Sequence, residues 1–225
     1  MHTQAFASDF TANKSFVWEF FFATLRKIPT TQTLCLRKDK MKIVILRHGK
    51  PVIPSLRKLS ASAFSEWVHE YNAAGLCPTS QPTDQAIKHA DECNAVVCSA
   101  LPRSFESAKA FNNKGFFLSD PIFNEAGLPV ANWQAMKLSP KIWAVVFRVL
   151  WLLGYSRNSE SFKEAKSRAS EAVERLSEIA RKYESVLFVG HGVYNRILAN
   201  ELRRHGWLGP KNPGSNHWAF GVYER

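Results

Sequence analysis

Met41-Lys42-Ile43-Val44-Ile45-Leu46-Arg47-His48-Gly49-Lys50 is the stretch of this 225-residue chain that decides its fold. Its four consecutive apolar residues, 43–46, are β-branched except for Leu46 and predict a short strand that is buried on both faces. The strand ends in Arg47, His48 and Gly49, so a cation and an imidazole lie at its carboxyl end. Open α/β sheets bind their ligands at that edge. Taken alone, this ending is also compatible with a surface histidine beside a solvated arginine.

Two further apolar runs end in side chains of the same kind. Residues 94–98 predict a buried strand followed by a loop that presents Arg103, and residues 186–190 predict another that ends in His191 and Gly192. Parallel strands share one carboxyl edge, so we expect four side chains to meet there: Arg47, His48, Arg103 and His191. A helix beginning after Gly192 would point free N–H groups at the same edge, and arginine donors match phosphate oxygens. The pattern predicts a pocket for a dianionic phosphoryl group.

The segments between these strands have the spacing of helices. Apolar side chains recur at i, i+3, i+4 and i+7 in residues 64–71, and Ser161 with Glu164 forms a capping box that opens a long helix. Shorter elements are predicted as well: helices at 83–90 and 193–202, and an edge strand within 216–224. Strands separated by helices predict an α/β fold, a three-layer α/β/α sandwich with a mostly parallel central sheet.

Composition narrows the classes of function. The chain carries a formal net charge of +11, dispersed along its length, whereas nucleic-acid-binding proteins usually concentrate such charge in a patch. A phosphorylated small-molecule or phosphoprotein substrate explains the same sign, and no nucleic-acid partner is expected. No stretch reaches the roughly 20 apolar residues of a transmembrane helix. The four cysteines and seven histidines lack metal-ligand spacing. We therefore expect a cytoplasmic protein that needs no metal or cofactor.

The chain divides near Met41. Residues 1–40 are rich in phenylalanine, end in a charged run and lack the order of regions found in a signal peptide. They are interpreted as a disordered extension or as a consequence of a mis-assigned start, with residues 41–225 as the domain. The apolar segment 140–153 is too short to span a bilayer and favours a buried or site-covering helix over a membrane-surface helix; it could belong to a lid insertion around 130–158.

Three motifs in order resemble those of the histidine phosphatase superfamily, the phosphoglycerate mutase-like proteins. They are Arg47-His48-Gly49, then Ser99-Ala-Leu-Pro-Arg103-Ser-Phe-Glu-Ser107-Ala108, then Val189-Gly190-His191-Gly192. The resemblance covers residues 41–225. It implies phosphoryl-binding roles for four residues: Arg47, Arg103, His191 and Gly192. It further implies that His48 is the phosphorylated nucleophile and Glu125 the proton donor, so that the catalytic residues are His48, Glu125 and His191.

The resemblance also indicates the reaction. The Ser and Asn that mutases of the family carry after Arg-His-Gly are replaced here by Lys50-Pro51-Val-Ile-Pro54, and Glu125 lacks the family's usual neighbours. These departures favour a metal-independent phosphatase that hydrolyses a phosphate monoester or phosphoramidate through a phosphohistidine. The alternatives are a phosphoglycerate mutase-type phosphotransferase, a phosphatase of phosphohistidine proteins, and a non-catalytic phospho-ligand binding module.

Overall fold

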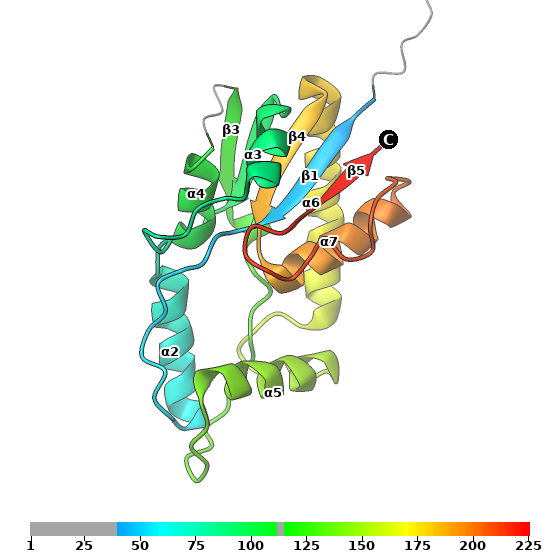
Figure 1. Ribbon diagram of the computed structural model, residues 1–225. Helices are drawn as coiled ribbons and strands as arrows, with labels where there is room; N and C mark the ends of the chain where they lie inside the picture. Colours follow the sequence, from blue (N-terminus) through cyan, green and yellow to red (C-terminus); the bar gives the residue numbers. More distant parts are fainter. Residues whose placement is uncertain (1–39, 112–114) are drawn as a thin grey trace, which may run out of the picture. The chain divides into compact units, whose positions relative to one another are not determined.

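A five-stranded sheet organises the computed structural model, which describes residues 40–111 and 115–225 (Figure 1). The strands are β1 (Lys42–Arg47), β2 (Ala95–Ser99), β3 (Phe116–Asp120), β4 (Ser185–Gly190) and β5 (Phe220–Glu224). Their order is β3-β2-β4-β1-β5, and all neighbours are parallel except β5, which runs antiparallel to β1 at one edge. The mostly parallel sheet and its edge strand are as predicted, whereas β3 was not predicted from the sequence.

The register of the strands explains why their carboxyl ends meet. Arg47, the last residue of β1, pairs with Gly190, the last residue of β4, and Cys98 of β2 pairs with Val189 of β4. The N–H of His48 then donates a 2.9 Å hydrogen bond to the Gly190 carbonyl. The residues that follow β1, β2 and β4 therefore enter one region at the edge of the sheet, as the sequence predicted.

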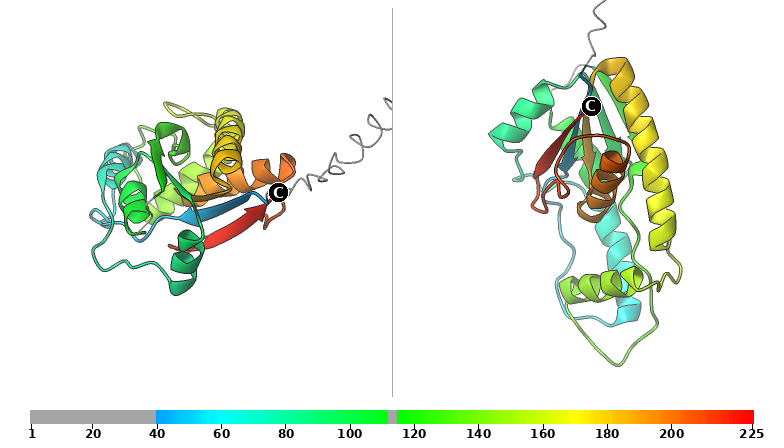
Figure 2. Two further views of the ribbon diagram at one scale, coloured as in Figure 1. Left: turned by 90° about the horizontal axis from the view of Figure 1, so that it is seen from above. Right: turned by 90° about the vertical axis from the view of Figure 1, so that its right-hand side faces the viewer.

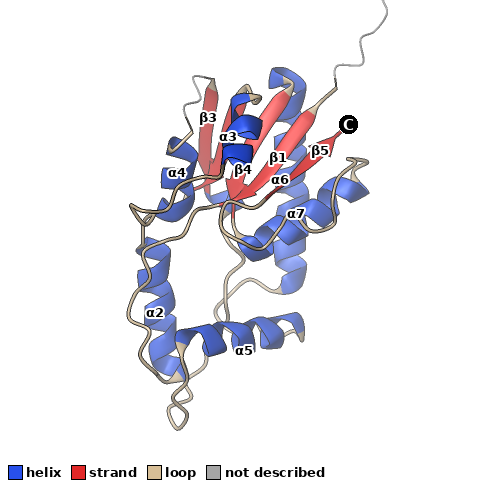
Figure 3. Cartoon of the chain, viewed as in Figure 1, coloured by secondary structure: helices blue, strands red, loops and turns tan. Residues whose placement is uncertain are grey.

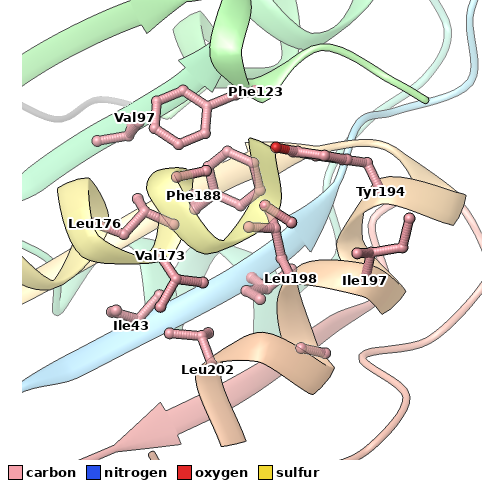
Figure 4. Packing of buried hydrophobic residues seen from close by; sticks show 14 of the residues in the cluster. Ile43, Val97, Phe123, Val173, Leu176, Phe188, Tyr194, Ile197, Leu198 and Leu202 are labelled. Atoms are coloured by element: carbon pink, nitrogen blue, oxygen red, sulfur yellow. The ribbon is translucent and has the colours of Figure 1, made fainter. Parts of the chain in front are cut away.

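Helices cover both faces of the sheet, which confirms the three-layer arrangement. Residues of α6 (Phe162–Tyr183) and α7 (Gly192–Arg204) share one apolar cluster with one side of the strands, including Ile43 (Figure 4). Residues of α3 (Asp84–Asp91) and α4 (Pro102–Lys109) share a second cluster with the alternate residues of the strands. Figure 2 shows α6 and α3 on opposite sides of the sheet. The capping box predicted at the start of α6 is present, with the Ser161 hydroxyl accepting from the Glu164 N–H.

Two helices lie beyond the carboxyl ends of β1 and β4, next to the predicted site (Figure 3). They are α2 (Ala61–Ala73) and α5 (Pro140–Leu152), and they enclose an apolar cluster of their own that includes Phe64, Trp143 and Phe147. Leu59 and Leu138 exchange two backbone hydrogen bonds of 2.9 and 3.0 Å, which join the segments preceding the two helices. These contacts fix α2 and α5 as a unit at the sheet edge.

The apolar segment 140–153 contains α5, and its side chains differ in how far they are buried. Trp143, Phe147 and Trp151 are buried, whereas Val145 and Leu153 are more than half exposed, at 64% and 79%. One face of the helix is thus buried, as predicted. Other residues of the helix line the pocket described below. The prediction of a lid insertion around 130–158 stays a prediction.

Lys40–Arg225 forms one compact unit by its contacts. The predicted extension, residues 1–40, lies outside the described residues except for Lys40. In the described part of the chain, no helix combines the length and apolar character required to cross a membrane.

Candidate active site

His48 is buried, with an exposed fraction of only 2%, directly after the end of β1. Its Nδ1 lies 2.6 Å from the carbonyl oxygen of Gly49. A carbonyl only accepts, so Nδ1 carries the proton, and the lone pair of the neutral ring is on Nε2. Burial lowers the pKa of His48 well below its usual range, and the positive charge of Arg103 lowers it further. The imidazole is therefore a neutral potential nucleophile at physiological pH.

The neighbouring Gly49 is confined by its surroundings. A Cβ atom at this position would lie 2.3 Å from the Trp218 ring and 2.6 Å from Leu76. The Gly49 N–H also donates to the Ser107 hydroxyl at 2.9 Å. Glycine is required here because of the close packing, and it holds the carbonyl that orients His48.

Arg47 lies beside the start of α7. Its Nη1 donates to the Ser215 carbonyl, while its buried Nε has no hydrogen-bond partner among the described residues. A Cβ on Gly192 would lie 3.3 Å from the guanidinium carbon, so glycine there lets the helix start approach the cation. The structure brings these two predicted residues together.

Arg103, in the first turn of α4, is almost fully buried, with 2% exposed. Its Nη1 donates to the Tyr71 carbonyl at 3.1 Å, its Nη2 donates to the Asn72 side chain at 3.2 Å, and its guanidinium lies 4.6 Å above the Tyr71 ring. Burial lowers the pKa of Arg103, but a guanidinium stays protonated in proteins. Its Nε, like that of Arg47, is buried and without a partner in the described part of the chain.

His191 is fully buried at the N-terminal end of α7, with its ring centroid 5.0 Å from that of His48. Its Nε2 lies 2.6 Å from the Ser99 hydroxyl, which already accepts a hydrogen bond from the Leu101 N–H. The Ser99 hydroxyl has no other acceptor among the described residues, so we assign its proton to Nε2 and the ring proton to Nδ1. Burial lowers the pKa of His191 well below its usual range, and the charges of neighbouring residues lower it further. Nδ1 has no partner among the described residues.

Serines of the second motif tie the strand ends together. The Ser104 hydroxyl donates to the Val189 carbonyl at 2.7 Å and accepts from the Ser99 N–H at 3.3 Å. The Ser107 hydroxyl donates to the Arg103 carbonyl at 2.6 Å. These buried hydroxyls connect β2 and α4 with β4, which fixes Arg103 relative to His191.

Asn195, which the sequence analysis did not identify, has a similar role. Its Oδ1 accepts from the His191 N–H at 3.0 Å, and its Nδ2 donates to the Leu46 carbonyl at 3.1 Å. One amide thus bridges the ends of β1 and β4, directly beside the two histidines. Serine and asparagine are common in many settings, so their types alone gave no signal of this role.

Glu125 caps the start of α7. Its Oε1 accepts from the N–H groups of Tyr194 at 2.8 Å and Ala126 at 3.0 Å, and its Oε2 accepts from Val193 at 3.2 Å. Two N–H groups of this helix, which the sequence predicted to be free for a phosphate, are therefore bound to Glu125. The carboxyl group also lines the same pocket as His48, so the structure does bring the predicted acid to the site.

His217 is a further site residue that the sequence analysis missed. Its ring centroid lies 5.7 Å from that of His48, and it lines the pocket. Burial and the charges of Arg47 and Lys50 lower its pKa. The following residue, Trp218, has φ of +64°, a left-handed conformation that is rare for a bulky residue. Its N–H donates to the Arg47 carbonyl at 3.0 Å, and this contact positions the loop against the end of β1.

A pocket of about 530 Å³ opens beside His48. Its polar end contains five site residues: Arg47, His48, Arg103, Glu125 and His217. The remainder of its wall comes from residues 51–56, α2, residues 124–128 and α5. Within residues 40–111 and 115–225, no three His, Cys, Asp or Glu side chains are grouped so as to hold a metal ion. The guanidinium groups of Arg47 and Arg103 at the polar end suit an anion.

Two mycobacterial proteins are among the solved structures with the same architecture. The chain is similar to the mycobacterial glucosyl-3-phosphoglycerate phosphatase, with 18% identity over 82% of this chain and 90% of that one and a TM-score of 0.55. It is also similar to the product of an open reading frame of Mycobacterium tuberculosis, with 18% identity over 81% and 90% of the two chains and a TM-score of 0.51. At this identity the likeness shows the fold. No curated protein matches the sequence.

A sequence profile covers the central part of the domain. It matches residues 83–209, which include the Arg103 and His191 motifs and Glu125, and it begins after the Arg47-His48-Gly49 motif. The matched segment is more than half of the chain, and the profile describes branch 1 of the histidine phosphatase superfamily. The chain belongs to the histidine phosphatase superfamily, branch 1.

Proposed function

We propose that this protein is a metal-independent phosphatase that hydrolyses a phosphate monoester or phosphoramidate through a phosphohistidine at His48. One observation carries the proposal: three buried donor atoms, on residues next to His48 or close enough for their charge or ring to act on it, have no hydrogen-bond partner among the described residues. They are Arg47 Nε, Arg103 Nε and His191 Nδ1. Native proteins rarely leave buried polar groups unpaired, and such groups call for a ligand. A phosphoryl group supplies the oxygens that these donors require.

The first chemical step is attack on phosphorus by Nε2 of His48. The neutral ring holds its lone pair on Nε2 because Nδ1 donates to the Gly49 carbonyl. As the bond to phosphorus forms, the bond to the leaving oxygen breaks, and the two arginines with His191 stabilise the charge on the phosphoryl oxygens. Preorganised donors of this kind supply most of the catalysis in phosphoryl transfer.

The leaving alcohol needs a proton, and Glu125 is proposed to supply it. Within the described part of the chain, Oε2 accepts one hydrogen bond, from Val193 at 3.2 Å, whereas Oε1 accepts two. Oε2 is therefore the atom that retains a lone pair for a proton. In the second step, water attacks the phosphohistidine, the carboxylate takes the proton, and His48 leaves as a neutral ring.

The shape of the pocket supports a small-molecule substrate over a phosphoprotein. The walls contributed by α2 and α5 give the site a volume of about 530 Å³ beside His48. A shallow site that a protein surface can approach would instead favour a phosphoprotein. A mutase-type reaction would need the phosphoryl group to return to the same substrate, for which the apolar walls offer few hydrogen-bonding partners.

Hydrolysis of p-nitrophenyl phosphate in the presence of EDTA tests the proposal. We expect turnover that vanadate inhibits and that the His48→Asn variant loses. His205→Asn is the matched control, because His205 follows the far end of α7. Activity that requires an added divalent ion would contradict the mechanism, and binding without turnover would indicate a phospho-ligand binding module.

A further inference from the structure

We infer that the substrate is a phosphate monoester of a hydrophobic alcohol, whose apolar part lies along α2 and reaches α5. This inference rests on the proposed function for the phosphoryl end of the ligand. It concerns the part of the pocket that binds no phosphoryl group.

An aromatic wall leads away from the phosphoryl site. Phe64, Trp67 and Tyr71 of α2 all line the pocket, and their rings stack in sequence, with centroids 5.8 Å apart for Phe64 and Trp67 and 5.2 Å for Trp67 and Tyr71. The Tyr71 end of the wall contacts the candidate active site, since the Tyr71 carbonyl accepts a hydrogen bond from Arg103. The Phe64 end contacts α5, since the Phe64 ring stacks on the Phe147 ring with their centroids 5.5 Å apart.

The length of this wall sets the size of the ligand. The seven steps from Phe64 to Tyr71 rise about 10 Å along the helix, about the length of an extended eight-carbon chain. Figure 3 shows α2 running from the edge of the sheet to α5. Because the three rings are already packed on each other, little side-chain entropy is lost when a ligand binds to them.

The other walls along this path are also apolar. Pro51, Ile53 and Leu56 contribute from the loop after β1, Val68 from α2, and Leu128 and Ala144 from the opposite side. Ile53 and Leu56 are 41% and 54% exposed, so the apolar surface continues outward. A ligand with a hydrocarbon portion removes this surface from water.

The charged groups among these walls are paired or exposed, and the two asparagines each accept one hydrogen bond. Arg148 donates to the carbonyls of Ala126 at 2.9 Å and Gly127 at 3.3 Å, and its guanidinium lies 4.7 Å from the Trp151 ring. Asn72 accepts from Arg103, and Lys141 is exposed. Beyond the phosphoryl site the walls therefore offer a ligand more apolar surface than polar partners.

Binding of n-alkylphosphonates tests the inference without requiring turnover, because the carbon–phosphorus bond is not hydrolysed. Calorimetry of the full chain with ethyl-, butyl-, hexyl- and octylphosphonate should show Kd falling about fourfold per methylene, roughly 200-fold from ethyl to hexyl. 3-Phosphoglycerate is the polar comparison and should bind more weakly than hexylphosphonate. Equal affinities across the series, or tighter binding of 3-phosphoglycerate, would overturn the inference.

Adjacent residues of α5 provide a matched pair of variants. Ala144 lines the pocket, whereas Val145 is 64% exposed on another face. Ala144→Glu should flatten the dependence of Kd on chain length, and Val145→Glu should retain it. Equal effects of the two variants would contradict the assigned path. Should Ala144→Glu not fold, as judged by its thermal transition, Val68→Asn tests the same wall from α2.

The same experiments separate this inference from the proposed function. Chain-length-dependent binding with no hydrolysis of hexyl phosphate or p-nitrophenyl phosphate would overturn the phosphatase and leave the ligand class in place. Hydrolysis of all esters at rates independent of chain length, together with flat phosphonate binding, would overturn the ligand class alone.

Discussion

The Glu125 carboxylate accepts a 2.8 Å hydrogen bond from the backbone N–H of Tyr194. With the second bond from Val193, it caps the helix that begins beside His191. A group in this position has two effects on the protein: it satisfies N–H donors of α7, and it lies in the pocket where a leaving group would be. The two effects are separable by experiment.

Glu125→Gln keeps the shape of the side chain but removes the proposed proton donor. We expect kcat for alkyl phosphates to fall by about 10²–10⁴-fold, the usual contribution of a general acid, and kcat for aryl phosphates to fall much less. Steady-state kinetics on hexyl phosphate and p-nitrophenyl phosphate measure the difference. Urea unfolding serves as the control, because an amide N–H₂ facing an N–H donor also costs stability. Equal losses on both substrates would assign Glu125 to capping alone.

Ser99→Ala tests the orientation of His191. Without the hydroxyl, Nε2 loses its donor, so the ring proton is no longer held on Nδ1. We expect kcat/KM to fall about 10–100-fold, comparable to the loss of an orienting partner in other sites. The ¹⁵N chemical shifts of the His191 ring should also report a change of tautomer. Ser119→Ala is the control, because Ser119 donates to the backbone carbonyl of the same Ser99. An unchanged tautomer would show that Ser99 does not orient the ring.

The buried histidines predict how stability depends on pH. The pKa values of His48 and His191 lie well below the usual value, chiefly because of burial, so the folded protein keeps both rings neutral where the unfolded chain takes up protons. The free energy of unfolding should therefore be unaffected by them above about pH 6.5 and should fall below it, by about 1.4 kcal/mol per pH unit for each histidine.

Urea unfolding between pH 5 and pH 7.5 measures this dependence. His48→Asn removes one titrating group and should reduce the slope on the acid side by about 1.4 kcal/mol per pH unit. Identical slopes in the variant and the unchanged protein would mean that His48 is protonated in both states.

We propose that the domain starts near Met41. Lys40–Arg225 forms a compact unit by its own contacts, and the Met41 N–H and carbonyl pair with Arg225 at 3.1 and 3.0 Å. A chain that begins at Lys40 should fold with its thermal transition within a few degrees of that of the full chain. Insolubility or loss of vanadate binding would place part of the first 39 residues in the folded domain.

The ends of β1, β2 and β4 were predictable because each strand is a run of apolar residues buried on both faces. Buried runs of this kind stand out in a sequence, and parallel pairing then brings their ends together. β3 was missed because Phe116–Asp120 is an edge strand with no fully buried residue, and its Ser119 and Asp120 interrupt the pattern. The long helices were predictable from a different signal, the helical spacing of their apolar residues.

Sequence reasoning missed three features of the site, because each depends on contacts between residues distant in sequence. They are the presence of His217, the bridging by Asn195 and the role of Ser99. His217 reaches the pocket through the Trp218 N–H bond to Arg47, which joins residues about 170 positions apart. Asn195 bridges β1 and β4 only once the strands have paired. The capping of α7 by Glu125 was hidden for the same reason, since the sequence showed a lone acid between turn residues.

The phosphohistidine itself tests the central claim most directly. The protein is mixed with ³²P-labelled aryl phosphate, quenched rapidly in base, digested, and analysed by mass spectrometry; the good leaving group makes the first step fast, so the intermediate accumulates. We expect the label on the peptide that contains His48, lost on treatment with acid and absent from His48→Asn. A label on another residue, or normal turnover by His48→Asn, would contradict the account.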